Sequence, residues 1–124
     1  MITGDTLRAL VVRQPFANLI RDGLKKIEVR SWTTAHRGDL LICAAKSADP
    51  GWEHDGNEPR GVTICIVTLL DIRPLRRSDV RPAMLGRGGW LLNEGSFAWV
   101  LRNPRRLLPY PLRGQLGLLT FRPA

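Results

Sequence analysis

Residues 25–30 read Lys-Lys-Ile-Glu-Val-Arg, and their pattern is the central evidence for how the N-terminal half of the chain folds. Its apolar and charged side chains alternate with the two-residue period of a β-strand. Ile27 and Val29 are therefore expected to face the core. The residues that alternate with them are expected to share the opposite face: Lys26, Glu28, Arg30 and Trp32. The stretch thus predicts a strand with one buried face and one face available to a ligand.

Upstream of this strand, the sequence predicts a first strand followed by a helix. Residues 7–12 form a short apolar run that suits a strand. Gln14-Pro15 ends this run, and proline suits the first turn of a helix because its missing N–H has no intrahelical partner there. Apolar residues then recur at helical spacing from Phe16 to Leu24, and Gly23 is the stop signal.

Downstream, further apolar runs predict strands separated by turns and loops. Arg37-Gly38-Asp39 is expected to form a turn, and residues 40–45 a strand buried on both sides. Residues 47–60 are rich in Asp, Glu, Gly, Pro and Asn, so we expect an exposed acidic loop. Residues 62–72 form the longest β-branched run and are expected to be a long central strand that ends at Pro74.

The C-terminal half is expected to contain short elements between loops. Residues 76–85 suit a short helix capped by Ser78, and residues 86–89 are expected to break the chain. Two further strands are predicted at residues 97–101 and 116–121, joined by the proline-rich segment 103–114. Short strands, one early helix and long loops predict a mixed α+β domain, not a parallel doubly wound sheet. The most economical arrangement is a small mixed β-barrel of about five to six strands, with one or two further short helices.

The length and composition set limits on the class of protein. A chain of 124 residues suits a single domain over residues 1–124 with its own hydrophobic core. No apolar run is long enough to cross a membrane and the N-terminus does not resemble a signal peptide, so we expect a cytoplasmic protein. Cys43 and Cys65 lie in apolar runs and are expected to be reduced core residues. The sequence predicts no oligomeric state.

The chain is strongly basic, with 19 Lys and Arg residues against 11 Asp and Glu residues and a formal net charge of +8. Such a charge favours a partner that carries phosphate or other anionic groups. The basic residues gather in segments 21–26, 73–81 and 102–106, whereas the acidic ones are concentrated in residues 49–58. This clustering favours a binding role over the alternative, in which the arginines only keep the protein soluble.

Polar residues of the N-terminal half are expected to converge on one ligand: Gln14, Lys25, Lys26, Glu28, Arg30, Arg37 and Lys46. Lysine and arginine hold phosphate, while glutamine and glutamate offer donors and acceptors to a base edge. Together they predict a pocket of nucleotide size. The alternative is a solvated strand face, on which Glu28 only pairs with a neighbouring cation.

Aromatic and arginine side chains extend this expected site. Phe16 and Trp32 are the candidates for base stacking. Arg102, Arg105 and Arg106 follow a predicted strand and form either a track for a nucleic-acid backbone or a plain solvated edge. No cofactor or metal site is predicted, because the adjacent loop residues Glu53, His54 and Asp55 cannot all face one ion.

Several stretches of the chain closely resemble the ASCH family, which belongs to the PUA-like superfamily. Residues 10–17 and 22–32 carry a Gln-Pro-aromatic helix start and a Gly-x-Lys segment followed by Glu-x-Arg and Trp. Residues 37–46 carry Arg-Gly before a buried strand that ends in Ala-x-Lys. The likeness extends to residues 61–71, 97–101 and 111–118, and so covers nearly the whole chain.

The resemblance implies a small PUA-like barrel with a cleft beside the first helix that binds single-stranded RNA, a nucleotide or a nucleoside. In this cleft, Pro15 and Phe16 would lie at the helix start beside the basic residues. Similar proteins imply an alternative, a hydrolase that acts on RNA as a ribonuclease or on a modified nucleoside, with Lys25 and Glu28 as catalytic residues. Glu28 stands where the nucleoside amidohydrolases carry their nucleophilic threonine, so deacylation by the same scheme is not expected. A second alternative is a protein-interaction module of transcription-related assemblies.

Overall fold

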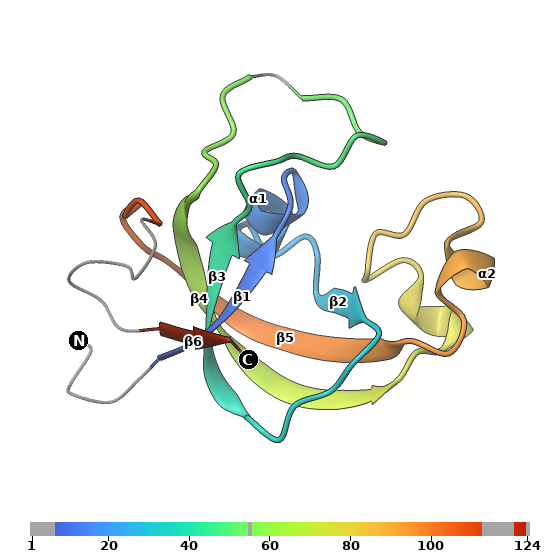
Figure 1. Ribbon diagram of the computed structural model, residues 1–124. Coiled ribbons are helices and arrows are strands. Elements are labelled where there is room, and N and C mark those ends of the chain that lie inside the picture. The colour runs from blue at the N-terminus through green and yellow to red at the C-terminus, as the bar shows by residue number, and fades with distance from the viewer. Residues whose placement is uncertain (1–6, 55, 113–120, 124) are drawn as a thin grey trace.

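The structure, a computed structural model, describes residues 7–54, 56–112 and 121–123. The strands are β1 (Leu7–Val12), β2 (Ile27–Arg30), β3 (Gly38–Ala44), β4 (Val62–Pro74), β5 (Phe97–Arg106) and β6 (Phe121–Pro123). The helices are α1 (Phe16–Arg21), the single 3-10 turn η1 (Arg77–Asp79) and α2 (Gly89–Asn93). The strands form one 6-stranded sheet in the order β2-β5-β4-β3-β1-β6 (Figure 1).

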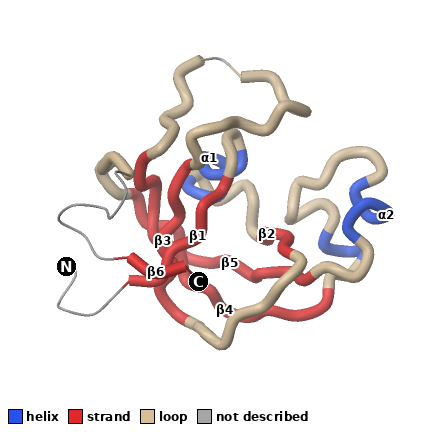
Figure 2. Tube along the Cα trace, viewed as in Figure 1, coloured by secondary structure: helices blue, strands red, loops and turns tan. Residues whose placement is uncertain are grey.

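The sheet is mixed and strongly curled (Figures 1 and 2). β1 runs parallel to β3 and to β6, and the other neighbouring strands are antiparallel. The prediction of an α+β, PUA-like barrel fold is therefore confirmed. The barrel is open, because β2 pairs with β5 alone among the described strands. This leaves a seam between β2 and β1 where a ligand can approach the interior.

The main core fills the inside of the curled sheet. It is built from β1, β3, β4 and β5, and α1 closes one side of it with Ala17 and Ile20. Ile42 of β3 and Trp99 of β5 have no exposed surface. Burying one such apolar side chain contributes about 1.5–3 kcal/mol to folding stability. The strands around the seam therefore pack on a stable core. Cys43 and Cys65 are buried and free, as predicted.

β5 is longer than the predicted strand, which ended at Leu101. Pairing with β4 continues from Thr68–Arg102 to Ile66–Arg105, with a register shift between these pairs. The shift leaves an extra residue on β5, and Asn103 adopts a φ of 54° there. Pro104 has no N–H to donate, so this bulge accommodates it without loss of a ladder hydrogen bond. Residues 107–112 of the predicted segment 103–114 are described and form no strand beyond an isolated bridge between Pro111 and Val62. Residues 113–120, and with them nearly all of the predicted strand 116–121, lie outside the described residues.

Residues 75–96 form a lobe that packs on β2 and β5 around a small second core of Ile27, Leu75, Ala83 and Ala98. The predicted helix capped by Ser78 is wrong: residues 77–79 form only one 3-10 turn. Asp79 organises this turn, because its carboxylate accepts the backbone N–H of Arg76 at 2.8 Å and a hydrogen bond from Arg73 at 2.7 Å. A buried carboxylate that is paired with an arginine stabilises the turn more strongly than an exposed serine hydroxyl does.

The predicted break is confirmed for residues 86–88, which lie in no helix or strand, but it ends one residue earlier than predicted because α2 begins at Gly89. Gly88, with a φ of 76°, turns the chain into this helix. Gly89 follows because a Cβ there would lie 2.5 Å from the Cβ of Leu85. Gly88 and Gly89 therefore start a helix and allow it to pack closely on Leu85 within the lobe.

Candidate ligand-binding cleft

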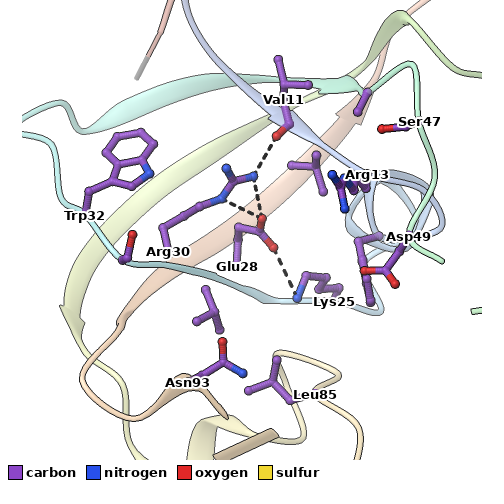
Figure 3. Close-up of a pocket in the computed structure, with 15 residues that line it drawn as sticks. Val11, Arg13, Lys25, Glu28, Arg30, Trp32, Ser47, Asp49, Leu85 and Asn93 are labelled. Carbon is purple, nitrogen blue, oxygen red and sulfur yellow. Dashed lines mark hydrogen bonds and ion pairs between the residues drawn. The ribbon is translucent and has the colours of Figure 1, made fainter. Parts of the chain in front are cut away.

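A cleft of about 670 Å³ lies at the open seam between β1 and β2 (Figure 3). The end of β1 contributes Val11 and Val12 to one wall, and β2 with its flanks contributes the other. Phe16 of α1, the chain after β3 and the lobe complete the lining. The volume lies within the range of small-molecule and cofactor sites.

Lys25 lies at the floor of this cleft. The chain turns sharply after α1 at Gly23, whose φ is 76°, and the N–H groups of Leu24 and Lys25 both donate to the carbonyl oxygen of Leu19. This turn sends the Lys25 side chain inward, where the residue is only 4% exposed. Its Nζ donates to the carbonyl oxygen of Ala83 and lies 5.1 Å from the ring centroid of Phe16.

The environment lowers the pKa of Lys25 below its ordinary value of 10.5. Burial is the largest cause, and the nearby Arg30 guanidinium acts in the same direction, whereas Glu28 opposes both. Because desolvation disfavours the charged form, the neutral amine is closer to accessible than in a surface lysine. Lys25 can therefore donate to an anionic ligand or, when neutral, accept a proton.

Glu28 and Arg30 of β2 continue the network across the seam. The Oε1 atom of Glu28 lies 3.4 Å from the Lys25 Nζ, and its Oε2 accepts the Arg30 Nε–H at 3.0 Å. The Nη2 of Arg30 then donates to the carbonyl oxygen of Val11 on β1 at 2.8 Å (Figure 3). A side chain thus bridges the two strands where backbone pairing is absent. The structure brings these predicted residues together as one network.

Aromatic rings form two sides of the cleft. Trp32 is 38% exposed and packs edge-on against the buried Trp99, with ring centroids 4.8 Å apart. The indole N–H of Trp99 donates to the backbone oxygen of Trp32 at 3.1 Å and so fixes the position of this residue. Phe16 makes a similar edge-on contact with Trp52 from the loop 47–60, at 5.2 Å. The cleft therefore combines aromatic surface with a fixed ion-pair network.

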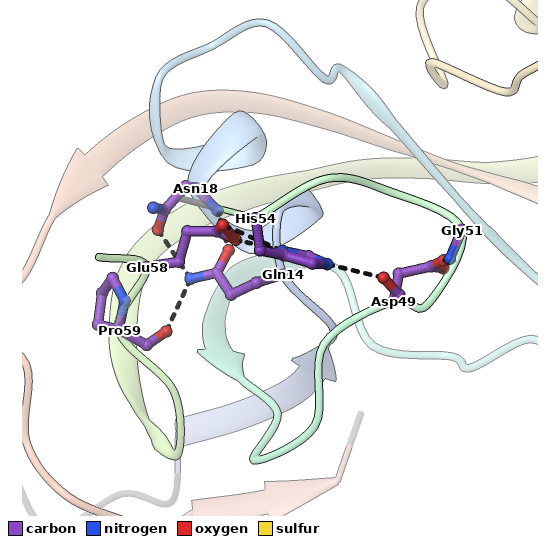
Figure 4. A network of polar contacts seen from close by, with 7 residues as sticks. All are labelled: Gln14, Asn18, Asp49, Gly51, His54, Glu58 and Pro59. Carbon is purple, nitrogen blue, oxygen red and sulfur yellow. Dashed lines mark hydrogen bonds and ion pairs between the residues drawn. The ribbon is translucent and has the colours of Figure 1, made fainter. Parts of the chain in front are cut away.

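Gln14, expected to contact a ligand, is fully buried beside the cleft and does not line it. Its Nε2 donates to Asn18 Oδ1 at 2.9 Å and to the Pro59 carbonyl oxygen at 2.8 Å, and its Oε1 accepts the Asn18 N–H at 3.0 Å (Figure 4). Pro15, joined to Gln14 by a cis peptide bond, stands at the start of α1 and is also outside the lining. The Gln14 amide binds the loop 47–60 to α1.

Three other predicted residues also lie outside the cleft. Lys26 is exposed and does not line the cleft; it precedes β2, whose pairing with β5 begins at Ile27. It lines a separate groove of about 170 Å³ together with Arg102. Arg37 donates to the carbonyl oxygens of Thr34 and His36 in its own turn. Lys46 is exposed at the end of β3, where its side chain packs near Gly61.

The predicted arginine track is divided. Arg105 bonds to Asp39 at 3.1 Å and to the hydroxyl of Thr68 at 3.2 Å. Arg106 instead reaches Asp22, behind α1, at 3.0 Å. Successive side chains of a strand point to opposite faces, so these neighbours cannot follow one path.

The cleft also contains residues that the sequence did not indicate. Arg13 follows β1, and Ser47 and Asp49 come from the loop after β3. Leu85 and Asn93 come from the lobe. Arg13 could have been found from its place beside the Gln-Pro motif, but the others come from segments with no periodic pattern.

Two features are absent from the described part of the chain. Among those residues, no cluster of His, Cys, Asp and Glu has the makings of a metal site. Within the same residues, no helix has both the length and the apolar character that crossing a membrane requires.

Comparison with known proteins identifies the family of this chain. The model of the ASCH domain matches residues 10–110. The chain is 27% identical over 123 residues to human Activating signal cointegrator 1 and 26% identical to the mouse protein; each match covers 85% of this chain but only 20% of the relative. Among solved structures, ASCH from Zymomonas mobilis superposes with a TM-score of 0.60 at 20% identity, covering 82% of this chain and 70% of that one. The chain belongs to the ASCH domain family.

Proposed function

We propose that this ASCH domain binds single-stranded RNA or a nucleotide in the cleft between β1 and β2. The PUA-like fold of the family is associated with RNA binding, and the net charge of +8 favours a phosphate-bearing partner. The observation that carries the proposal is the fixed network of Lys25, Glu28 and Arg30 beside an exposed face of Trp32. Cations held next to a stacking surface suit a nucleotide, which has a phosphate and a flat base.

Each residue of the network has a distinct role in this proposal. A lysine ammonium has three N–H donors, and the described partners of Lys25 are the Ala83 carbonyl and Glu28, so a further donor is available to a phosphate or base carbonyl. Glu28 orients both cations. Arg30 presents its remaining guanidinium edge, and Trp32 stacks on the base. Lys26 and Arg102, beside the smaller groove, would hold the backbone that leaves the cleft.

Fluorescence anisotropy with labelled single-stranded RNAs of defined composition tests this proposal. We expect Lys25→Met, Arg30→Ala and Trp32→Ala each to weaken binding by about tenfold or more, because one such contact is worth about 1–3 kcal/mol. Arg81→Ala is the charge-matched control, since Arg81 is exposed on the lobe and does not line the cleft. Circular dichroism establishes that each variant is folded. Equal losses in the control and the cleft variants would contradict a role for the cleft.

Salt dependence provides a second test of the same proposal. If phosphates contact the protein, log Kd should rise linearly with log salt concentration, because each contact releases condensed counterions. Removing Arg30 should reduce the slope by about one contact, whereas removing Trp32 should weaken binding without changing the slope. A flat response in the unmodified protein would indicate a small uncharged ligand, such as a nucleoside.

The lowered pKa of Lys25 supports a second candidate function, hydrolysis of RNA or of a modified nucleoside. A lysine that is more readily neutral can act as a base or nucleophile, and Glu28 at 3.4 Å can exchange a proton with it. Mass spectrometry of the protein with RNAs and modified nucleosides would separate the two functions. Retention without conversion identifies a binding domain, and conversion that disappears in Lys25→Met identifies an enzyme.

The similarity to Activating signal cointegrator 1 supports a third candidate, a protein-interaction module. The chain spans about a fifth of the length of that relative, so the likeness concerns one domain of it. Absence of both retention and conversion in the mass-spectrometric assay would favour this candidate over the other two.

A further inference from the structure

Three residues of the loop 47–60 form a polar clasp, which we define as Asp49, His54 and Glu58 (Figure 4). The Nδ1 atom of His54 lies 2.8 Å from the Glu58 Oε2 and 3.0 Å from its Oε1. The Nε2 atom lies 2.7 Å from the backbone oxygen of Asp49. The His54 side chain is 17% exposed, so the ring is largely enclosed by these contacts.

The two contacts of His54 determine its protonation. A carbonyl oxygen and an ionised carboxylate can only accept hydrogen bonds, and each faces a different nitrogen of the ring. A neutral imidazole carries a single N–H, so it would set two lone pairs against each other at one of these contacts. The clasp is complete only with a proton on both nitrogens, which is the charged imidazolium.

The clasp is joined to the cleft at several points. Asp49 lines the cleft, and its backbone N–H donates to the Gln14 oxygen at 2.8 Å. Trp52, between Asp49 and His54, packs on Phe16, which also lines the cleft. At the other end of the loop, Gln14 holds the carbonyl oxygen of Pro59. The imidazolium ring connects the two arms of the loop, and these contacts place the connected loop against the cleft.

We propose that protonated His54 closes the loop 47–60 against the cleft, and that deprotonation releases the loop and weakens ligand binding. The effect on binding rests on the function proposed above, whereas the closing of the loop does not. Among the described residues, Glu58 and Arg60 are the charged groups that act on His54, the first favouring its charge and the second opposing it. The α1 side of the loop presents the neutral amides of Gln14 and Asn18.

The direction of the pH effect follows from these contacts. The Asp49 carbonyl, and after it the Glu58 carboxylate, raise the pKa of His54 above its ordinary 6.5, although burial and Arg60 oppose this. A raised pKa means that the closed loop is favoured at a pH below 6.5 and is lost as the pH rises through the higher value in the folded protein. Binding should therefore be stronger in mildly acidic solution.

NMR titration from about pH 5.5 to about pH 9 tests the clasp directly. The His54 ring and the Trp52 indole should titrate together, with one midpoint above the ordinary histidine value of about 6.5. His54→Gln should abolish the Trp52 titration. His36→Gln is the matched control, because the His36 ring bonds to the Asp39 carbonyl oxygen and lies outside the cleft; it should leave the Trp52 titration intact.

Binding of a fluorescein-labelled single-stranded RNA over the same pH range tests the link to the cleft. Its affinity should fall by about fivefold or more through the His54 midpoint, in the natural chain and in His36→Gln. The inference would be overturned if the Trp52 signals titrated with a midpoint different from that of His54. It would also be overturned if the RNA affinity did not change with pH through the shared midpoint. Absence of RNA binding at every pH, with the shared titration intact, would overturn the proposed function and still support the clasp.

Discussion

The ammonium of Lys25 and the carboxylate of Glu28 lie 3.4 Å apart at the floor of the cleft, with only 4% and 10% of the two side chains exposed. An ion pair this deeply buried gains little net stability, because desolvation of both charges offsets their attraction. The ion pair instead orients its neighbours. Arg30 donates to the other carboxylate oxygen of Glu28 and, across the seam, to the backbone oxygen of Val11. The ion pair therefore helps to fix the Arg30 guanidinium, which links β2 to β1 across the open seam.

Replacing Glu28 should lower the pKa of Lys25 further. In Glu28→Gln the attraction that raises the pKa disappears, while burial and Arg30 continue to lower it. The titration of the Lys25 ε-carbon, followed by NMR, measures this shift. Glu94→Gln removes an exposed carboxylate outside the cleft and should leave the titration as it was. An unchanged Lys25 titration in Glu28→Gln would disprove the coupling.

Trp32 and Trp99, which are in edge-on contact, should have different roles. Trp99 has no exposed surface, so Trp99→Ala should lower the free energy of unfolding by about 3–5 kcal/mol. Trp32→Ala should lower it by only about 0.5–1.5 kcal/mol, the value of one edge-on ring contact, yet reduce RNA affinity. Urea unfolding and anisotropy, compared on both variants, check this. A large loss of stability in Trp32→Ala would make its role structural.

The turn at residues 77–79 should depend on Asp79 and not on Ser78. Asp79→Asn should lower the free energy of unfolding by about 1–3 kcal/mol, because it weakens the bonds to Arg73 and to the backbone of Arg76. Ser78→Ala should change it little, since Ser78 is exposed. Equal losses in both would contradict the structure of this turn.

Asp79 should also contribute to unfolding in acid. The Arg73 guanidinium holds the pKa of Asp79 below its ordinary 3.8, an effect that the Arg76 backbone N–H reinforces and burial opposes. Its contribution to stability is therefore complete above pH 3.8 and is lost as the pH falls through the lower folded value. Stability measured against pH should show a smaller acid loss in Asp79→Asn than in the natural chain. Parallel curves would exclude this linkage.

Gln14 should support the loop rather than contact a ligand. Gln14→Leu keeps the side-chain volume but leaves the Asn18 N–H and the Pro59 oxygen without their partner. It should therefore lower the free energy of unfolding by about 1–3 kcal/mol. Lys46→Ala should change the free energy of unfolding little, because Lys46 is exposed. Hydrogen exchange should show faster opening of residues 56–60 in Gln14→Leu. If exchange there stays slow while RNA affinity falls, Gln14 instead acts on the ligand.

Local patterns predicted the strands and the first helix because the burial of a single element leaves its period in the sequence. Residues 7–12 form the predicted first strand, and the alternation around Ile27 predicted β2. The longest β-branched run became β4, and its end at Pro74 was predicted as well. The lobe was harder to predict, because its turn depends on the pairing of Asp79 with Arg73 and its helix on the close contact of Gly89 with Leu85.

The barrel, the family and the charged residues of β2 could all be predicted from the chain, because each leaves a short-range period or a local motif. Which of those residues meet depends on contacts between distant segments. The tertiary structure placed Lys25, Glu28 and Arg30 in one cleft, turned Gln14 into the core and separated Arg105 from Arg106. A site in an open barrel depends on where the seam lies and on which loops pack beside it. Those contacts join residues far apart in the chain, and no local period records them.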